Sequence, residues 1–181
     1  MSFFHHQIIE LFNKTFYLSH KTKLVAGTGE PLYQPANNEQ DFHQIIFAHQ
    51  YFSSALHEIA HWLVAGEKRR LQVDYGYWYE PDGRDEIKQS EFEKVEVYPQ
   101  AIEWALSASC GFKFDVSSDN LSGIVINRLA FKRKVYLQVI SLLETGFSER
   151  TNALLTSCRA FYQTAPLTIE SFEYQGMYEL I

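Results

Sequence analysis

The chain has 181 residues, of which 46% are hydrophobic and 15% aromatic, and its formal net charge is −6 at pH 7. This apolar content excludes a chain that is disordered throughout, and the length fits one catalytic domain over residues 1–181. A net negative charge disfavours direct binding of nucleic acid. The best apolar run, Val135–Leu143, is too short and too interrupted to cross a membrane. We therefore expect a globular protein with neither nucleic-acid nor membrane binding.

The two cysteines indicate the redox environment in which the protein works. Cys110 and Cys158 stand far apart in the chain, and neither belongs to a C-x-x-C pair. This spacing excludes a zinc ribbon and a disulfide scaffold, and it suits a reducing environment. The N-terminal residues also lack the basic and apolar pattern of an export signal, so we expect a cytoplasmic protein.

The first third of the chain predicts a helix, a strand, a loop and a second strand, in that order. Their expected ranges are residues 3–16, Lys23–Ala26, Thr28–Asp41 and Gln44–Ala48. A second helix follows, because apolar residues recur at helical spacing up to Gly66. Ser53 or Ser54 is the expected N-cap of that helix, and Gly66 is its expected end.

The rest of the chain predicts mostly helices. Residues 71–87 read as a loop or short strand that is closed by a turn at Pro81-Asp82-Gly83. A helix should begin at Ser90, because Ser90 and Glu93 match a capping box, and it should run to Ser109 with a kink at Pro99. Beyond it we expect a polar loop and two final helices, over Asp115–Gly123, Arg128–Glu144 and Glu149–Gln163. The expected class is α+β, mostly helical with a small sheet.

The motif that carries chemistry is His57-Glu58-Ile59-Ala60-His61, an H-E-x-x-H sequence on the second predicted helix. Side chains four residues apart lie on one face of a helix, so both imidazoles can reach one metal ion. Glu58 follows the first histidine and can contact a water molecule on that ion. The motif predicts a metal site on a central helix.

A third protein ligand must come from elsewhere, because two histidines leave the site incomplete. His61 is the last histidine of the chain, so a later ligand should be a carboxylate. The helix that follows Ser90 offers Glu91, Glu93, Glu96 and Glu103. Glu96 borders the apolar face of that helix, and a carboxylate at such a place needs a partner or a metal. We therefore expect Glu96 as the third ligand, with Glu103 as the alternative.

Two histidines and one carboxylate leave two chemistries open. One is catalytic zinc, with Glu58 as the base of a hydrolase such as a small metallopeptidase of minimal gluzincin type. The other is non-haem iron, which is held by the same kind of ligand set and binds dioxygen at its open positions. The types of the ligands do not separate the two.

Several longer runs resemble the bacterial elongation factor P hydroxylase family. They are Ile45–His49 with Ser54–Trp62, Val73–Tyr79 with Pro81–Asp85, Phe92–Val97 with Pro99–Ala101 and Trp104, and Ser117 with Asp119–Leu121. The resemblance covers almost the whole chain. It implies a fold similar to that of a small metal-dependent ribonuclease. It also implies hydroxylation of the β-lysylated lysine of elongation factor P, with dioxygen as co-substrate and Fe(II) held by His57, His61 and Glu96. In such an oxygenase, Glu58 would orient a water molecule or a neighbouring group.

The implied substrate directs attention to the segment from Asp74 to Asp85, which is rich in aromatic and acidic residues. A β-lysylated lysine carries ammonium groups on a long apolar stem, and aromatic faces and carboxylates recognise such groups. We expect substrate contacts from Asp74, Tyr77, Tyr79, Asp82 and Asp85. Separately, His49 lies just before the motif helix, and we expect it to contact and orient a metal ligand.

Overall fold

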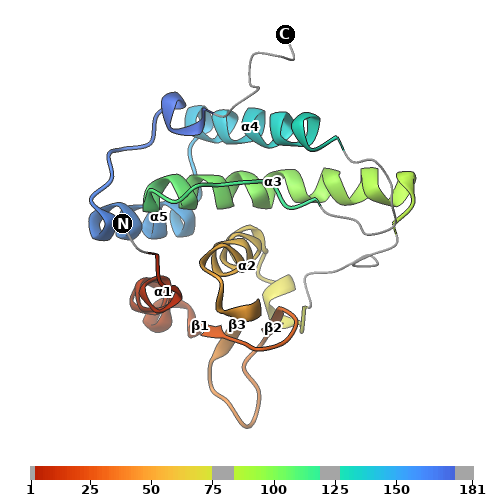
Figure 1. Cartoon of the computed structure of the whole chain (residues 1–181). Coiled ribbons are helices and arrows are strands. Elements are labelled where there is room, and N and C mark those ends of the chain that lie inside the picture. The colour runs from red at the N-terminus through yellow and green to blue at the C-terminus, as the bar shows by residue number, and fades with distance from the viewer. Residues whose placement is uncertain (1–2, 75–83, 119–126, 174–181) are drawn as a thin grey trace.

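The computed structural model describes residues 3–74, 84–118 and 127–173. Within these residues there are five helices and a three-stranded sheet, with the first helix beside the sheet next to the first strand and the other four helices above it (Figure 1). The helices are α1 (His5–His20), α2 (Phe52–Val64), α3 (Glu86–Cys110), α4 (Arg128–Thr145) and α5 (Glu149–Tyr162). The strands are β1 (Thr22–Ala26), β2 (Leu32–Gln34) and β3 (His43–Phe47), and short 3₁₀ turns are η1 (Ala48–Gln50), η2 (Arg69–Leu71) and η3 (Ile169–Phe172). The predicted α+β class, mostly helical with a small sheet, is confirmed.

The sheet has the order β1-β3-β2, with β3 parallel to β1 and antiparallel to β2. Strand β2 corrects the prediction of an uninterrupted loop over Thr28–Asp41. Only three residues between Pro31 and Pro35 are extended, so no alternating pattern marks the strand. Tyr33 pairs with Ile45 of β3 and also forms a bridge with Asp74, so distant partners define this strand.

Helix α2 lies between the sheet and α3, and it follows β3 after the single turn η1 (Figure 1). Its buried residues follow the predicted apolar pattern and are Phe52, Ala55, Leu56, Ile59, Ala60, Trp62 and Leu63. The predicted cap at Ser53 or Ser54 is wrong, because the helix begins at Phe52 and has Tyr51 as its N-cap. The Ser54 hydroxyl instead accepts a hydrogen bond from the backbone N–H of Ala48, at 3.1 Å.

The start of α3 also differs from the prediction. The helix begins at Glu86, and the Asp85 carboxylate caps it by accepting from the backbone N–H of Lys88 at 2.8 Å. Ser90 therefore lies inside the helix, and Glu93 accepts from Lys134 Nζ at 3.0 Å instead of serving a capping box. Asp85 is as good a cap as serine, and the residues after it favour a helix.

Helix α3 is the central element of the helical layers and packs against α2, α4 and α5. Most of its residues from Glu96 to Cys110 are buried, and Pro99 lies within this helix. The buried polar residues Glu96, Gln100 and Glu103 share one helix face, because they are spaced by four and three residues. This face meets α2 at the two motif histidines.

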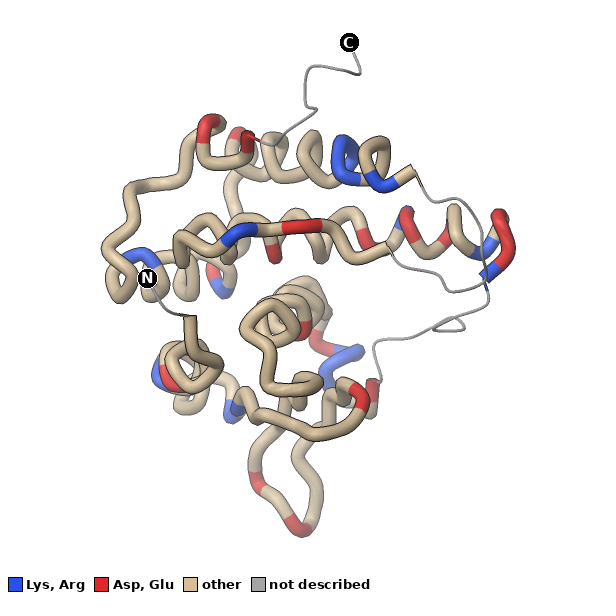
Figure 2. The backbone as a smooth tube through the Cα atoms, in the orientation of Figure 1, with Lys and Arg blue, Asp and Glu red and all other residues tan. Residues whose placement is uncertain are grey.

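Helices α4 and α5 follow the predicted ranges to within one residue at their ends. Lysine and arginine residues gather in the first turns of α4 (Figure 2), from Arg128 to Lys134. No helix among residues 3–74, 84–118 and 127–173 combines the length and the apolar character needed to cross a membrane. Cys110 and Cys158 are both free thiols buried in the core.

Candidate metal centre

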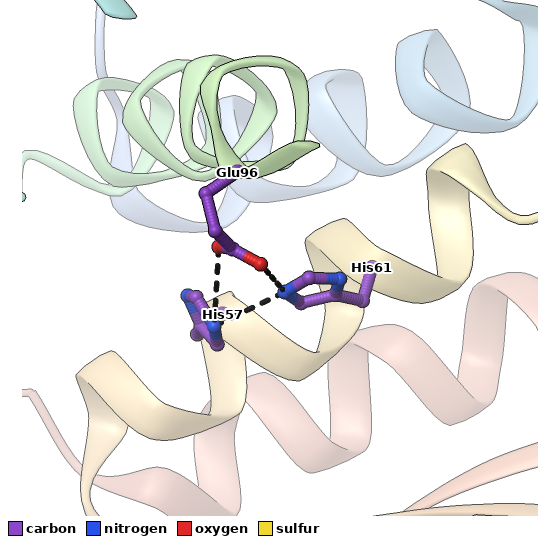
Figure 3. A group of neighbouring side chains, drawn as sticks. All are labelled: His57, His61 and Glu96. Atoms are coloured by element: carbon purple, nitrogen blue, oxygen red, sulfur yellow. Dashed lines mark hydrogen bonds and ion pairs between the residues drawn. The ribbon is translucent and has the colours of Figure 1, made fainter. Parts of the chain in front are cut away.

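Helices α2 and α3 bring His57, His61 and Glu96 together (Figure 3). The two Nε2 atoms of His57 and His61 lie 3.1 Å apart. Glu96 Oε1 lies 3.4 Å from His61 Nε2, and Glu96 Oε2 lies 3.9 Å from His57 Nε2. The two histidines lie one helical turn apart on the same face of α2, as the spacing of the motif predicts. The carboxylate comes from the facing helix and is 5% exposed.

These separations suit a single ion. Donor atoms that share an ion at about 2.1 Å are about 3 to 3.4 Å from one another. The separation of the two Nε2 atoms and that of Glu96 Oε1 from His61 lie in this range, whereas Glu96 Oε2 is farther from His57, at 3.9 Å. Both imidazoles remain partly exposed, His57 at 24% and His61 at 16%. An ion at this place would be held by protein on one side and open on the other. Two imidazoles and one carboxylate fit either Fe(II) or Zn²⁺.

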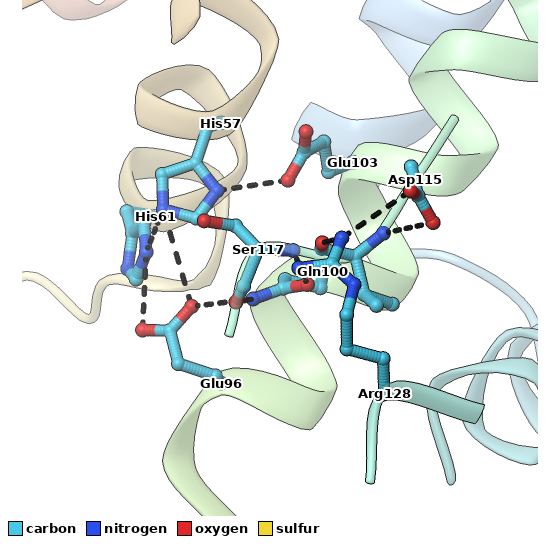
Figure 4. Close-up of polar contacts among 9 residues, drawn as sticks. His57, His61, Glu96, Gln100, Glu103, Asp115, Ser117 and Arg128 are labelled. Carbon is cyan, nitrogen blue, oxygen red and sulfur yellow. Dashed lines mark hydrogen bonds and ion pairs between the residues drawn. The ribbon is translucent and has the colours of Figure 1, made fainter. Parts of the chain in front are cut away.

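Glu103 contacts the opposite nitrogen of His57 (Figure 4). Its Oε2 accepts from His57 Nδ1 at 2.8 Å, so this carboxylate lies on the far side of the ring from Glu96. Burial lowers the pKa of His57, but the adjacent Glu103 carboxylate, together with the charges of Glu58 and Glu96, raises it to about 10. Because Glu103 holds a proton on Nδ1, Nε2 is the nitrogen that can bind an ion, after it gives up its own proton. Glu103 therefore fits the place of an orienting partner better than that of the third ligand.

Glu96 is held ionised by its surroundings. Burial raises the pKa of its carboxyl group, but the hydrogen bond and charge of His61 act in the opposite direction. His57 and Gln100 add to this effect, and the pKa falls to about 2. The Gln100 amide donates to Glu96 Oε2 at 3.2 Å. A carboxylate must be ionised to bind a metal ion, and Glu96 is held in that state beside two ring nitrogens.

Glu58 lies beside this group and lines a small pocket together with His61 and Asp74. The pocket holds about 30 Å³, which is room for about two water molecules. Burial raises the pKa of Glu58, although the two motif histidines act against it. A carboxyl group so placed can accept from, or donate to, a water molecule next to His61.

The predicted substrate residues are divided between described and undescribed parts of the chain. Tyr77, Tyr79 and Asp82 lie outside the described residues, as does the predicted turn at 81–83. Asp74 lines the pocket, where its carboxylate accepts from Arg69 Nε at 2.5 Å. Asp85 is the exposed N-cap of α3. Substrate binding by these five residues stays a prediction.

His49 is exposed and lies in η1, with a left-handed backbone at φ 54°. Its ring centroid is 6.0 Å from that of Tyr51, and it is not among the three converging side chains. Its expected role as a partner of a metal ligand stays a prediction.

Sequence reasoning missed Gln100 and the segment Asp115–Ser118. Gln100 is fully buried, and its amide bonds both the Glu96 carboxylate and the backbone of Ser117. The sequence does carry one signal, because Gln100 follows Glu96 by one helical turn on the same face. The backbone partner has no such signal, since residue 117 lies beyond the end of α3.

Two packed helices that present two histidines and one carboxylate define a candidate mononuclear metal site. A sequence model of elongation factor P hydroxylase matches residues 11–172 of this chain. A relative from Haemophilus influenzae, named elongation factor P lysine hydroxylase, is 51% identical over 157 residues, which cover 87% of this chain and 88% of that protein. The chain belongs to the elongation factor P hydroxylase family. It is therefore an enzyme that catalyses a hydroxylation, which is an oxidoreductase reaction.

Proposed function

We propose that this enzyme hydroxylates the β-lysylated lysine of elongation factor P, with Fe(II) at the candidate metal centre and dioxygen as co-substrate. The observation that carries the proposal is the convergence of His57, His61 and Glu96 in a chain of this family. The name of the Haemophilus influenzae relative supports elongation factor P as the substrate. The donor set supports iron, because two imidazoles and one carboxylate are the usual ligands of non-haem Fe(II) in oxygenases.

The proposed ligands are His57 Nε2, His61 Nε2 and the Glu96 carboxylate. When bound, Fe(II) supplies the redox chemistry with dioxygen that hydroxylation of an unactivated carbon requires. One oxygen atom enters the substrate and the other leaves as water, so a reductant supplies two electrons. The enzyme's own residues keep Glu96 ionised and hold the His57 ring in place through the Glu103 carboxylate on its opposite nitrogen.

The neighbouring carboxylates have distinct proposed roles. Glu103 holds the proton of His57 at Nδ1 and fixes the direction of the ring. Glu58 lines the pocket beside His61 and orients a water molecule there. Neither carboxylate is needed as a hydrolytic base in a hydroxylation, and the family assignment does not favour the zinc metallopeptidase alternative.

Recognition of the substrate is proposed to involve Asp74, Tyr77, Tyr79, Asp82 and Asp85. Of these, Asp74 lines the same pocket as His61 and Glu58. Its pairing with Arg69 means that an incoming ammonium group would share this carboxylate or displace the guanidinium. We further propose that residues 1–181 act as one catalytic domain in the cytoplasm, where translation factors work.

The experiment uses protein purified without oxygen and reconstituted with Fe(II). It is mixed with β-lysylated elongation factor P, dioxygen and a reductant, and mass spectrometry looks for the gain of one oxygen atom on the modified lysine. Hydroxylation should require the metal and should be lost in His57→Ala, His61→Ala and Glu96→Ala, with metal content falling in each. Glu58→Gln should keep its metal and lose less activity than the ligand variants. Zinc retention with peptide cleavage and no oxygen gain would contradict the proposal.

The aspartates are tested separately by kinetics. Asp74→Asn, Asp82→Asn and Asp85→Asn keep the size of the side chain and remove its charge. A lost charge-assisted contact of about 1.5–3 kcal/mol corresponds to an increase in KM of about ten- to a hundredfold. Asn is also a good helix cap, so Asp85→Asn should leave α3 intact. Unchanged KM in all three variants, with lower melting temperatures, would assign these residues to the scaffold.

A further inference from the structure

Gln100 is a fully buried amide between the candidate ligand Glu96 and a segment that follows α3 (Figure 4). Its Nε2 donates to Glu96 Oε2 at 3.2 Å and to the carbonyl oxygen of Ser117 at 2.7 Å. Its Oε1 accepts from the backbone N–H of Ser117 at 3.0 Å. Both N–H groups and the oxygen of this side chain are therefore used.

These partners fix the orientation of the amide. In the flipped orientation the amide oxygen would face two other oxygen atoms, and the NH₂ group would face a backbone N–H. Three contacts would then be lost at a site without access to water, where each unsatisfied group is costly. The donor therefore points to Glu96, and one oxygen of that carboxylate is occupied by a neutral hydrogen bond.

The segment that supports Gln100 is itself anchored from two sides. Arg128 donates to the carbonyl oxygen of Val116 at 2.7 Å and to the Asp115 carboxylate at 3.2 Å. Lys132 Nζ donates to the other oxygen of Asp115 at 3.0 Å. At the other end, Gln89 Nε2 donates to the carbonyl oxygen of Ser118 at 3.2 Å. Gln100 is thus held against a backbone that the first turns of α4 and the start of α3 keep in place.

We propose that Gln100 is a positioning residue for the metal ligand Glu96. A carboxylate on a flexible stem can rotate, and Gln100 fixes Oε2 so that Oε1 faces His61 Nε2 at 3.4 Å. The ligand then reaches the ion without first being ordered. Loss of such an outer hydrogen bond usually weakens metal binding by about ten- to a hundredfold. This inference rests on the proposed metal site.

The test compares two glutamines of the same helix. Gln100→Met removes the contacts to Glu96 and to Ser117 at nearly constant volume. Gln89→Met is the control on the same helix, because Gln89 is also buried and also donates to the segment, at Ser118, but it lies two helical turns before Glu96 and its oxygen accepts from Arg84 Nε instead. The dissociation constant for Fe(II) is measured without oxygen by competition with a chelator. It should rise about ten- to a hundredfold in Gln100→Met and stay within about twofold in Gln89→Met.

A shorter amide guards against loss of folding. Gln100→Asn keeps a polar group in the core but lacks one methylene, so it cannot hold Glu96 and Ser117 together, and metal binding should weaken. Native affinity in a folded Gln100 variant would overturn the inference, and so would equal weakening in Gln89→Met. The site is checked by His61→Ala. Metal binding that persists in that variant would overturn the proposed site itself.

Discussion

The two ring nitrogens of His57 face different groups. Its Nδ1 faces the Glu103 carboxylate at 2.8 Å, and its Nε2 faces His61 and Glu96. The ring is therefore oriented before any ion arrives. Because Glu103, with Glu58 and Glu96, outweighs burial and raises the pKa of His57 to about 10, an ion must displace a proton at neutral pH, and metal affinity should increase with pH.

The same shifts predict how stability depends on pH in the metal-free protein. His57 has an ordinary pKa of 6.5 and a folded value of about 10, so its contribution is complete below 6.5 and is lost as the pH rises through 10. Glu96 has an ordinary pKa of 4.5 and a folded value of about 2, so its contribution is present above 4.5 and is lost as the pH falls through 2. The free energy of unfolding should therefore be largest between these ranges.

Glu103→Gln isolates the alkaline part of this profile. The amide lacks the charge of Glu103 but leaves Glu58 and Glu96 beside His57, so the decline between pH 6.5 and 10 should become smaller, while the acid decline remains. Urea unfolding at a series of pH values measures both limbs. An alkaline decline of native size in Glu103→Gln would mean that another group supplies it.

At the scale of elements, the position of α2 depends on Arg150 of α5. Its guanidinium donates to the carbonyl oxygens of Trp62, Leu63 and Ala65 at 2.9 to 3.3 Å. These carbonyls belong to the end of α2, where the helix itself offers no further backbone N–H groups to donate to them. The guanidinium also lies 4.8 Å above the Trp62 ring. One side chain from a distant helix thus closes the end of the helix that carries both histidines.

Arg150→Met should lower the free energy of unfolding by about 1–3 kcal/mol, because the partly buried carbonyls of Trp62 and Leu63 lose this donor, whereas Ala65 still accepts from Arg70. The stability of Arg150→Lys should lie between that of Arg150→Met and that of the native protein. Lysine keeps the charge but cannot donate to several carbonyls with a planar guanidinium. Denaturant unfolding measures all three proteins. A Met variant as stable as the native protein would show that water replaces the guanidinium at no cost.

Local signals set most element ranges but misplaced one important boundary. Ser90 with Glu93 and Asp85 with Lys88 are competing ways to begin the same helix, and both satisfy the local rules. Asp85 prevails in the structure because residues 86–89 also fold as helix, and Gln89 then reaches Ser118. Strand β2 was missed for a related reason, since its three residues are extended only through pairing with β3.

For the whole molecule, an ion would link α2 to α3 and so join the sheet side of the protein to the helical layers. A ligand that binds only the folded state stabilises it by about 2.7 kcal/mol at one hundred times its dissociation constant. For a chain of this length that corresponds to a rise in melting temperature of about 5–10 °C. Differential scanning calorimetry without oxygen, with Fe(II) added, should show this rise. His61→Ala should show none, and a rise of native size there would place the ion elsewhere.

The sequence by itself determined the helical class, the pair of motif histidines and the acidic residue expected to join them. Each of these is a matter of spacing along one helix, because a 3.6-residue repeat decides which side chains share a face. Only the tertiary structure decided what Glu103 and Gln100, the other two polar residues on the buried face shared with Glu96, do. Glu103 meets the outer nitrogen of His57, and Gln100 meets the backbone of Ser117. These contacts join elements that are distant in the chain, and packing rather than local spacing creates them.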